Sequence, residues 1–145
     1  MNYQVPKPLR SNVAFLLRVA GERAIELVDR ELLPTGFHSR HAAILALAED
    51  QTLNQNMIAE ATRTHPNAVI GLIDALEQRS MARREQNPLN RREYLVRITP
   101  EGKKLLRQME RATGKALGKF TDHLSDAEKA DFDRLLLKCI EAWHG

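Results

Sequence analysis

Residues 79–102 read RSMARREQNPLNRREYLVRITPEG and have the pattern of a basic β-hairpin. Apolar and polar side chains alternate over residues 94–98, which predicts a strand, and residues 82–86 predict a shorter partner strand. Asparagine and proline within residues 87–90 favour a turn between the two strands. The sequence therefore predicts a hairpin that directly follows a helix.

Positive charge is concentrated in this hairpin. Three glutamates are set against six arginines, which are Arg79, Arg83, Arg84, Arg91, Arg92 and Arg97. Residues 79–107 carry a local net charge of +6, whereas the whole chain carries +3, so the remaining residues sum to −3. Arginine is always charged and its planar fork matches phosphate geometry, so a protruding arm of this kind suits a polyanion.

Length and composition limit the fold class. A chain of 145 residues is about the size of one domain, and scarce aromatic residues (5%) with many Leu, Ala, Glu, Arg and Lys favour helix. Cys139 is the single cysteine, which excludes an intramolecular disulfide, and neither a charged-then-apolar leader nor a long apolar run occurs. We therefore expect one mainly α domain over residues 1–145, in the cytoplasm, without a membrane partner or a cofactor.

Two short helices are predicted ahead of the hairpin. Asn54 is a good N-cap for a helix over residues 55–61, and Thr64 is predicted to cap the next helix, which tolerates Pro66 in its first turn. The buried stripe of that second helix is expected to be Val69, Leu72, Ile73 and Leu76. Two short helices joined by a tight turn and followed by a hairpin form a winged helix-turn-helix, here expected over residues 38–99.

Further helices are predicted on both sides of this pair. Apolar residues recur with helical spacing over residues 9–33, and Ser39 is predicted to cap a helix that ends near residue 50. After the hairpin, Thr99 and Ser125 are predicted to cap two more helices, the last with an apolar stripe that ends at Trp143. The expected fold class is thus mainly α with a small β-hairpin wing.

Three segments of the chain carry a family resemblance. They read LNQNMIAEA (residues 53–61), VIGLIDALEQRSMARRE (69–85) and NPLNRREYLVRITPEGKKLL (87–106). Together with the order of the predicted elements, they resemble the multiple antibiotic resistance regulator (MarR) family of bacterial transcription factors. The resemblance implies a homodimer whose long N- and C-terminal dimerisation helices, residues 9–33 and 100–145, interleave. It also implies binding to double-stranded DNA at a pseudo-palindromic operator, and repression that a small-molecule effector releases.

The resemblance further implies which residues contact DNA. Family members carry aspartate, any residue and arginine at the wing tip, where the arginine enters the minor groove; here these positions hold Asn90 and Arg92. In the recognition helix, Asn67 is the best candidate to read a base, because an amide can bond adenine in two places. Of Arg83 and Arg84, one is expected to face phosphate while the other covers the hairpin. The expected DNA contacts are Asn54, Gln55, Thr64, His65, Asn67, Ile70, Arg83, Arg84, Asn90, Arg91 and Arg92.

An effector site is implied by the same resemblance. The start of the second helix, together with the first helix, borders the family's effector pocket, so Arg18, His38, Arg40 and His41 are expected to meet an anionic aromatic ligand. Capping and surface histidines are an equally good interpretation of His38 and His41. No third ligand with metal spacing lies near these two histidines in the sequence, so no metal site is expected.

Two other classes of protein compete with a regulator. An enzyme is disfavoured, because the sequence contains no glycine-rich phosphate loop, nucleophile motif or metal signature. A winged-helix protein-interaction module with weak or lost DNA binding is suggested by Ile70, Gly71 and Asn90, and the focused positive charge argues against it. Cys139 lies on an apolar stripe, where a free cysteine is more often a small buried residue than a redox sensor.

Overall fold

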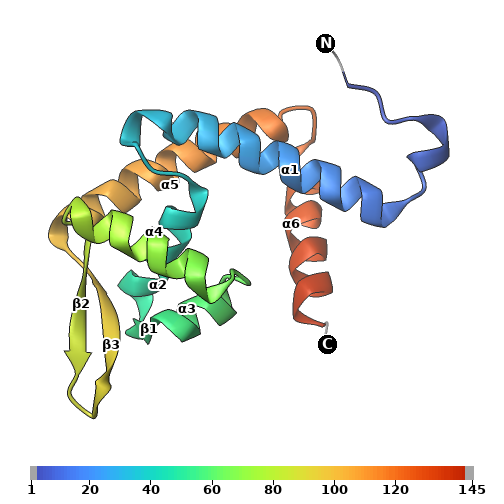
Figure 1. The fold of residues 1–145 in the computed structure, drawn as a ribbon. Helices are drawn as coiled ribbons and strands as arrows, with labels where there is room; N and C mark the ends of the chain where they lie inside the picture. The colour runs from blue at the N-terminus through green and yellow to red at the C-terminus, as the bar shows by residue number, and fades with distance from the viewer. Residues whose placement is uncertain (1–2, 143–145) are drawn as a thin grey trace.

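The structure is a computed structural model that describes residues 3–142. Its helices are α1 (Val13–Leu32), α2 (Ser39–Asp50), α3 (Gln55–Ala61), α4 (Pro66–Gln78), α5 (Pro100–Phe120) and α6 (Asp126–Glu141), with short 3-10 turns at Lys7–Leu9 and Leu33–Thr35. Its strands are β1 (Leu53–Asn54), β2 (Ala82–Asn87) and β3 (Asn90–Ile98). Figure 1 shows the β2–β3 hairpin projecting from a helical body. The expected fold class, a mainly α winged helix-turn-helix, is confirmed.

The sheet is antiparallel, with strand order β1-β3-β2. β1 was not predicted; it pairs with β3 through Leu53 opposite Val96 and Asn54 opposite Leu95. Both hairpin strands extend further toward the tip than the sequence pattern predicted, so that only two residues separate them. The third strand anchors the hairpin to the residues just before α3.

The core lies between the end of α1, α2, the helix-turn-helix, the sheet and α5. Its largest fully buried side chains are Leu32, Ile44, Leu45, Ile58, Val69, Ile73, Leu76, Val96, Leu106 and Met109. The predicted stripe of α4 is confirmed, with Leu72 only partly buried at its edge. Because one face of α4 is held in the core, its opposite face is presented to solvent in a fixed orientation.

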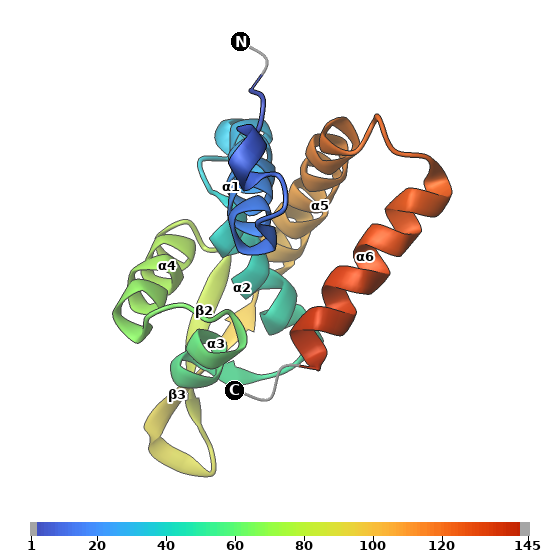
Figure 2. The same ribbon diagram turned by 90° about the vertical axis from the view of Figure 1, so that its right-hand side faces the viewer.

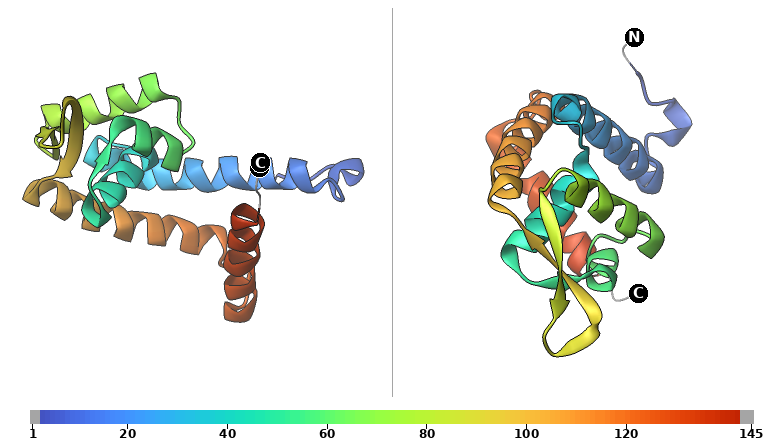
Figure 3. Two further views of the ribbon diagram at one scale, coloured as in Figure 1. Left: turned by 90° about the horizontal axis from the view of Figure 1, so that it is seen from below. Right: turned by 60° about the vertical axis from the view of Figure 1, so that its left-hand side comes forward.

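Helix α6 makes little use of this core. Figure 3 (left) shows α1 and α5 side by side, with α6 leaving from the end of α5, and Figure 2 shows α6 as an arm apart from the helix-turn-helix. No residue of Asp126–Glu141 is buried. A cleft of about 580 Å³ separates α6 from α1 and α5; Leu16, Leu17, Leu117, Phe132 and Leu136 are among its apolar lining. Cys139 is exposed, so the expectation that it is buried is wrong for the single chain. Trp143 lies outside the described residues.

Side-chain caps define most helix starts. The predicted caps Asn54, Thr99 and Ser125 are confirmed, since each side chain accepts a hydrogen bond from the backbone N–H three residues on. The first helix starts later than predicted, because Asn12 caps it and the preceding residues form a 3-10 turn. Ser39 is not the cap of α2: its backbone N–H donates to Asp29 of α1 at 2.7 Å, and His38 takes the cap position.

Candidate nucleic-acid interface

Helices α3 and α4 are joined by a tight turn that aims α4 outward. Arg63 in this turn has a left-handed backbone, with φ of 50°. Pro66 begins α4 and favours an extended residue before it, so His65 is the N-cap, and its Nδ1 accepts from the backbone N–H of Asn67 at 3.2 Å. The prediction that Thr64 caps α4 is therefore wrong; its hydroxyl donates to a carbonyl within the turn.

The exposed face of α4 is small and uncharged near its start. Asn67 and His65 are exposed, whereas Ile70 is only partly exposed beside the core face. A Cβ added at Gly71 would meet nothing within 4 Å, so this part of the surface is open. Asn67 is therefore the most accessible hydrogen-bonding side chain in the first two turns of the helix.

The wing tip presents two arginines at an interruption of the strand pairing. Gln86 pairs with Tyr94, but the next pair is Asn87 with Asn90, so residues 91–93 bulge out of the ladder. Arg91 and Arg92 lie in this bulge, and both are exposed. A bulge breaks the alternation of strand side chains and turns neighbouring residues in new directions. Both cations can therefore face the same partner.

Side chains of asparagine order the turn itself. Asn87 Oδ1 accepts from the backbone N–H of Leu89 at 3.0 Å, and Asn90 Oδ1 accepts from the backbone N–H of Arg92 at 3.2 Å. Asn90 at the wing tip is therefore linked to Arg92 by a hydrogen bond to the Arg92 backbone. Its carbonyl oxygen is neutral, so it adds no charge against the nearby guanidinium.

Glu93 connects this tip to the helix-turn-helix. Its two carboxylate oxygens accept from the side-chain amides of Asn54, at 2.5 Å, and Asn87, at 2.7 Å. The sequence did not indicate a role for this residue. No local pattern could have found it, because Asn54 is distant in sequence and only the β1–β3 pairing brings it alongside the wing.

The arginines at the base of the hairpin hold the unit together. Arg84 Nη1 donates to Asp74 of α4 at 2.7 Å and also to Glu77, and the Arg84 backbone N–H donates to Glu77 at 2.6 Å. Arg79 donates to the Thr35 carbonyl at 3.0 Å, which ties the end of α4 to the loop after α1. Both guanidinium groups are therefore engaged in contacts within the chain.

Arg83 points outward from the same strand. Its side chain is 66% exposed, compared with 22% for Arg84. Arg83 and Arg97 both donate to Glu85. Burial would raise the pKa of the Glu85 carboxyl, but the hydrogen bonds and charges of these two arginines outweigh it and the pKa is lowered. Glu85 therefore stays ionised and orders the outer face of the hairpin.

The four expected effector ligands do not come together within one chain. The backbone N–H of His38 donates to Nδ1 of His41 at 3.2 Å, so these two residues form a helix cap. Burial, and then the charge of His38, lowers the pKa of His41 to about 4. Arg40 is exposed on the first turn of α2. Arg18 pairs with Glu22 and lies about 21 Å before the end of α1, at 1.5 Å rise per residue.

Neither a metal site nor a membrane-spanning helix is found within residues 3–142. No group of three or more His, Cys, Asp or Glu in this range is arranged to hold a metal ion. No helix in the same range is long and apolar enough to cross a membrane.

Comparison with known proteins finds several similar regulators. A transcriptional regulatory protein for the hcr operon of Thauera aromatica is 27% identical over 96 residues, which span 66% of this chain and 58% of that protein. A MarR-family regulator from Rhodococcus sp. RHA1 superimposes with a TM-score of 0.84 at 28% identity, covering 90% of this chain and 94% of the other. CouR from Rhodococcus jostii RHA1, solved with p-coumaroyl-CoA, gives 0.81 at 27% identity over 97% and 99% of the two chains. No model of a protein family matches the chain.

Proposed function

We propose that this chain is a MarR-family winged-helix transcriptional regulator, and that it forms a homodimer, binds duplex DNA and represses transcription. The observation that carries the proposal is the wing tip, where exposed Arg91 and Arg92 stand on a bulge beyond the helical body. Arginine in such a position fits the narrow, electronegative minor groove. The wing supplies affinity for any duplex, because it recognises the charge of the phosphates and the shape of the groove and does not read individual bases.

Helix α4 lies in the major groove in this proposal. Asn67 reads a base edge, His65 and Thr64 approach the backbone or neighbouring bases, and the exposed part of Ile70 contacts a thymine methyl. The N-terminus of α3, at Gln55, approaches phosphate. Because α4 offers few base-reading groups, phosphate contacts and DNA shape contribute much of the binding.

A second copy of the chain covers the apolar surfaces of α1, α5 and α6. Leu135 and Ile140 of α6 are 50% and 70% exposed, and Val13 of α1 is 66% exposed. A helix with no buried residue is poorly stabilised in water, because most helical stability comes from packing an apolar face. The partner's terminal helices fill the cleft beside α6, and the resulting two-fold axis demands a pseudo-palindromic operator.

A small-molecule effector releases the repressor from DNA in this proposal. The support is the similarity to CouR, which was solved with p-coumaroyl-CoA, a ligand with an aromatic acyl group and phosphates. An anionic aromatic compound would meet the cationic side chains Arg18 and Arg40 only after a dimer forms, because one chain holds them apart. His38 and His41 then take part in ligand binding, because they lie at the start of α2.

A salt titration tests DNA binding against the alternative, a protein-interaction module. The wild-type protein is titrated onto a random-sequence duplex and onto a duplex that it selects from a random pool. The logarithm of the affinity should fall steeply and linearly with the logarithm of salt concentration, because phosphate neutralisation releases counterions. Absence of binding to both duplexes would refute the proposal.

Base reading by Asn67 is tested on the same pair of duplexes. Asn67→Ala should cost about 1 to 3 kcal/mol on the selected duplex and little on the random one. Equal losses on both would instead make Asn67 a backbone contact.

A further inference from the structure

The bulge that carries the wing arginines lacks regular strand pairing. Residues 91–93 fall between the pairs Gln86–Tyr94 and Asn87–Asn90, so the ladder does not determine their backbone conformation. Side chains do this instead: Gln86 Nε2 donates to the Arg91 carbonyl at 2.8 Å, and Asn90 accepts from the Arg92 backbone. These contacts order the bulge within the hairpin, but they do not orient it relative to α3 and α4.

Glu93 is placed to provide that orientation. One carboxylate oxygen accepts from Asn87 across the hairpin and the other accepts from Asn54 outside it. Asn54 is itself held, because its Oδ1 accepts from the backbone N–H of Met57 and caps α3. The amide of Asn54 is thus fixed to the helix by its oxygen and to the wing by its nitrogen.

The contact between Glu93 and Asn54 lies beyond the end of the β1–β3 pairing, toward the wing tip. The last β1–β3 pair joins Asn54 to Leu95, and Glu93 lies two residues nearer the tip. Arg92 and Glu93 both line a recess of about 280 Å³ between the N-terminus of α3 and the wing. A contact beyond the end of the ladder restrains the outer hairpin where strand pairing with β1 no longer does.

We propose that Glu93 is a positioning residue for DNA binding: by bridging Asn87 and Asn54, it sets the direction in which Arg92 leaves the wing. The inference rests on the proposed function. It assigns to Glu93 no contact with DNA; its negative charge would by itself oppose binding. The benefit is geometric, since a pre-oriented arginine loses less conformational freedom when it enters a groove.

Two substitutions separate geometry from charge. Glu93→Gln keeps the shape and removes the charge, but it presents a donor nitrogen to one of two donor amides and so loses one hydrogen bond. Glu93→Asp keeps the charge and is one methylene too short to reach both amides. Glu85→Gln is the matched control: it removes the same charge from the same hairpin, where Arg83 and Arg97 hold the carboxylate.

The experiment is a double-mutant cycle with Arg92→Ala. Dissociation constants are measured by fluorescence anisotropy at fixed salt on the duplex that the wild-type protein selects from a random pool. Both Glu93 variants should weaken binding about 5-fold or more in the wild-type background and less than about 2-fold in the Arg92→Ala background, because residues that act through each other are not additive. Glu85→Gln should bind as tightly as wild type or more tightly.

Each outcome decides a different statement. Equal losses in the two backgrounds, or no loss from either Glu93 variant, would overturn the role of Glu93 while DNA binding stands. Failure of the wild-type protein to bind any duplex would instead refute the proposed function. Circular dichroism checks folding; if neither Glu93 variant folds, Asn54→Ser keeps a good helix cap, removes the amide donor and is placed in the same cycle.

Discussion

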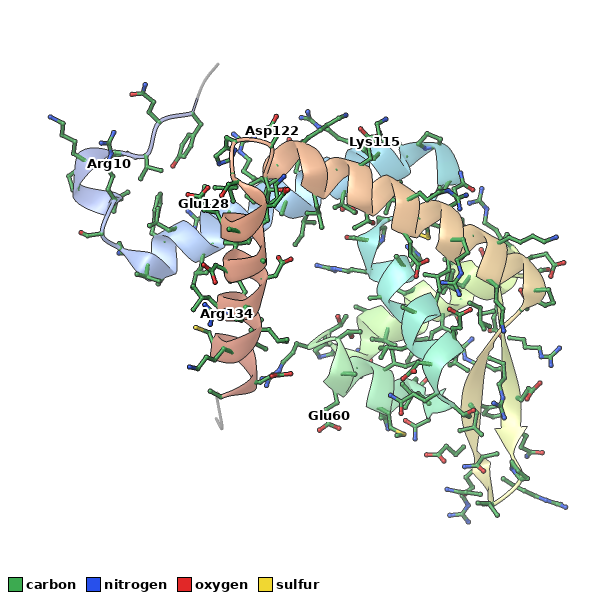
Figure 4. The ribbon with its side chains drawn as sticks, turned by 180° about the vertical axis from the view of Figure 1, so that it is seen from behind. Arg10, Glu60, Lys115, Asp122, Glu128 and Arg134 are labelled. Atoms are coloured by element: carbon green, nitrogen blue, oxygen red, sulfur yellow. The ribbon has the colours of Figure 1, made fainter. Side chains whose placement is uncertain are left out.

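Arg92 offers the most direct test of the electrostatic contribution to DNA binding. Arg92→Ala should weaken binding to every duplex, and the slope of log affinity against log salt should flatten by about 0.9, the contribution of one phosphate. Lys115→Ala is the control, because it removes the same charge from α5, on the side away from the wing in Figure 4. In this variant Lys119 still pairs with Glu31. A folded Arg92→Ala protein with unchanged affinity and slope would remove the wing from DNA binding.

His41 makes stability depend on pH. Burial and the neighbouring His38 lower its pKa from 6.5 to about 4, so the unfolded chain takes up a proton near pH 6.5 and the folded chain does not until about pH 4. The free energy of unfolding should therefore be constant above about pH 7 and fall by on the order of 3 kcal/mol between pH 6.5 and pH 4.

The control for this pH dependence is His41→Gln, which keeps a side chain able to reach back to the cap N–H of α2 but does not titrate. The free energy of unfolding, measured with urea at several pH values, should depend less steeply on pH for the variant than for the wild type. Identical slopes would place the pH dependence in other groups.

The packing of α5 against the start of the wing depends on a glycine. Thr99 caps α5, and Gly102 in the first turn packs so closely that an added Cβ would lie 1.9 Å from the carbonyl oxygen of Met81. Gly102→Ala should cost about 2 to 4 kcal/mol of unfolding free energy, because backbone must shift to relieve the clash.

Gly114, in the same helix, has nothing within 4 Å of an added Cβ. Gly114→Ala should instead stabilise the protein by about 0.5 to 1 kcal/mol, since alanine is the better helix former. Denaturation of both variants at one protein concentration measures the contrast; a similar effect of the two substitutions would show that the contact with Met81 is unimportant.

Dimerisation should control DNA binding. Replacing Leu136 and Ile140 with glutamate should abolish the dimer and operator binding together, because the proposed interface is apolar and buries upwards of about 2,000 Å². Operator half-sites should then lie about 34 Å apart, one turn of DNA. Lys138→Glu changes the charge of the same helix without altering its apolar face. Sedimentation of the wild-type protein as a stable monomer at micromolar concentration would defeat the model.

Much of this molecule follows from short-range patterns. The apolar stripe of α4, the caps at Asn54, Thr99 and Ser125, and the basic hairpin depend on residues a few positions apart, so they can be predicted without knowing the rest of the fold. The start of α4 was missed by one residue, because the conformation before Pro66 outweighed the usual preference of threonine for the cap position.

Contacts between distant segments could not be predicted in this way. The partner of Glu93 is set by the pairing of β1 with β3, and the division of labour between Arg83 and Arg84 depends on which one faces the carboxylates of α4. Side-chain chemistry and local periodicity are properties of the chain, and they determined the fold class and the basic wing. Which cations remain free for a partner, and which hold the protein together, was decided only when packing brought the elements side by side.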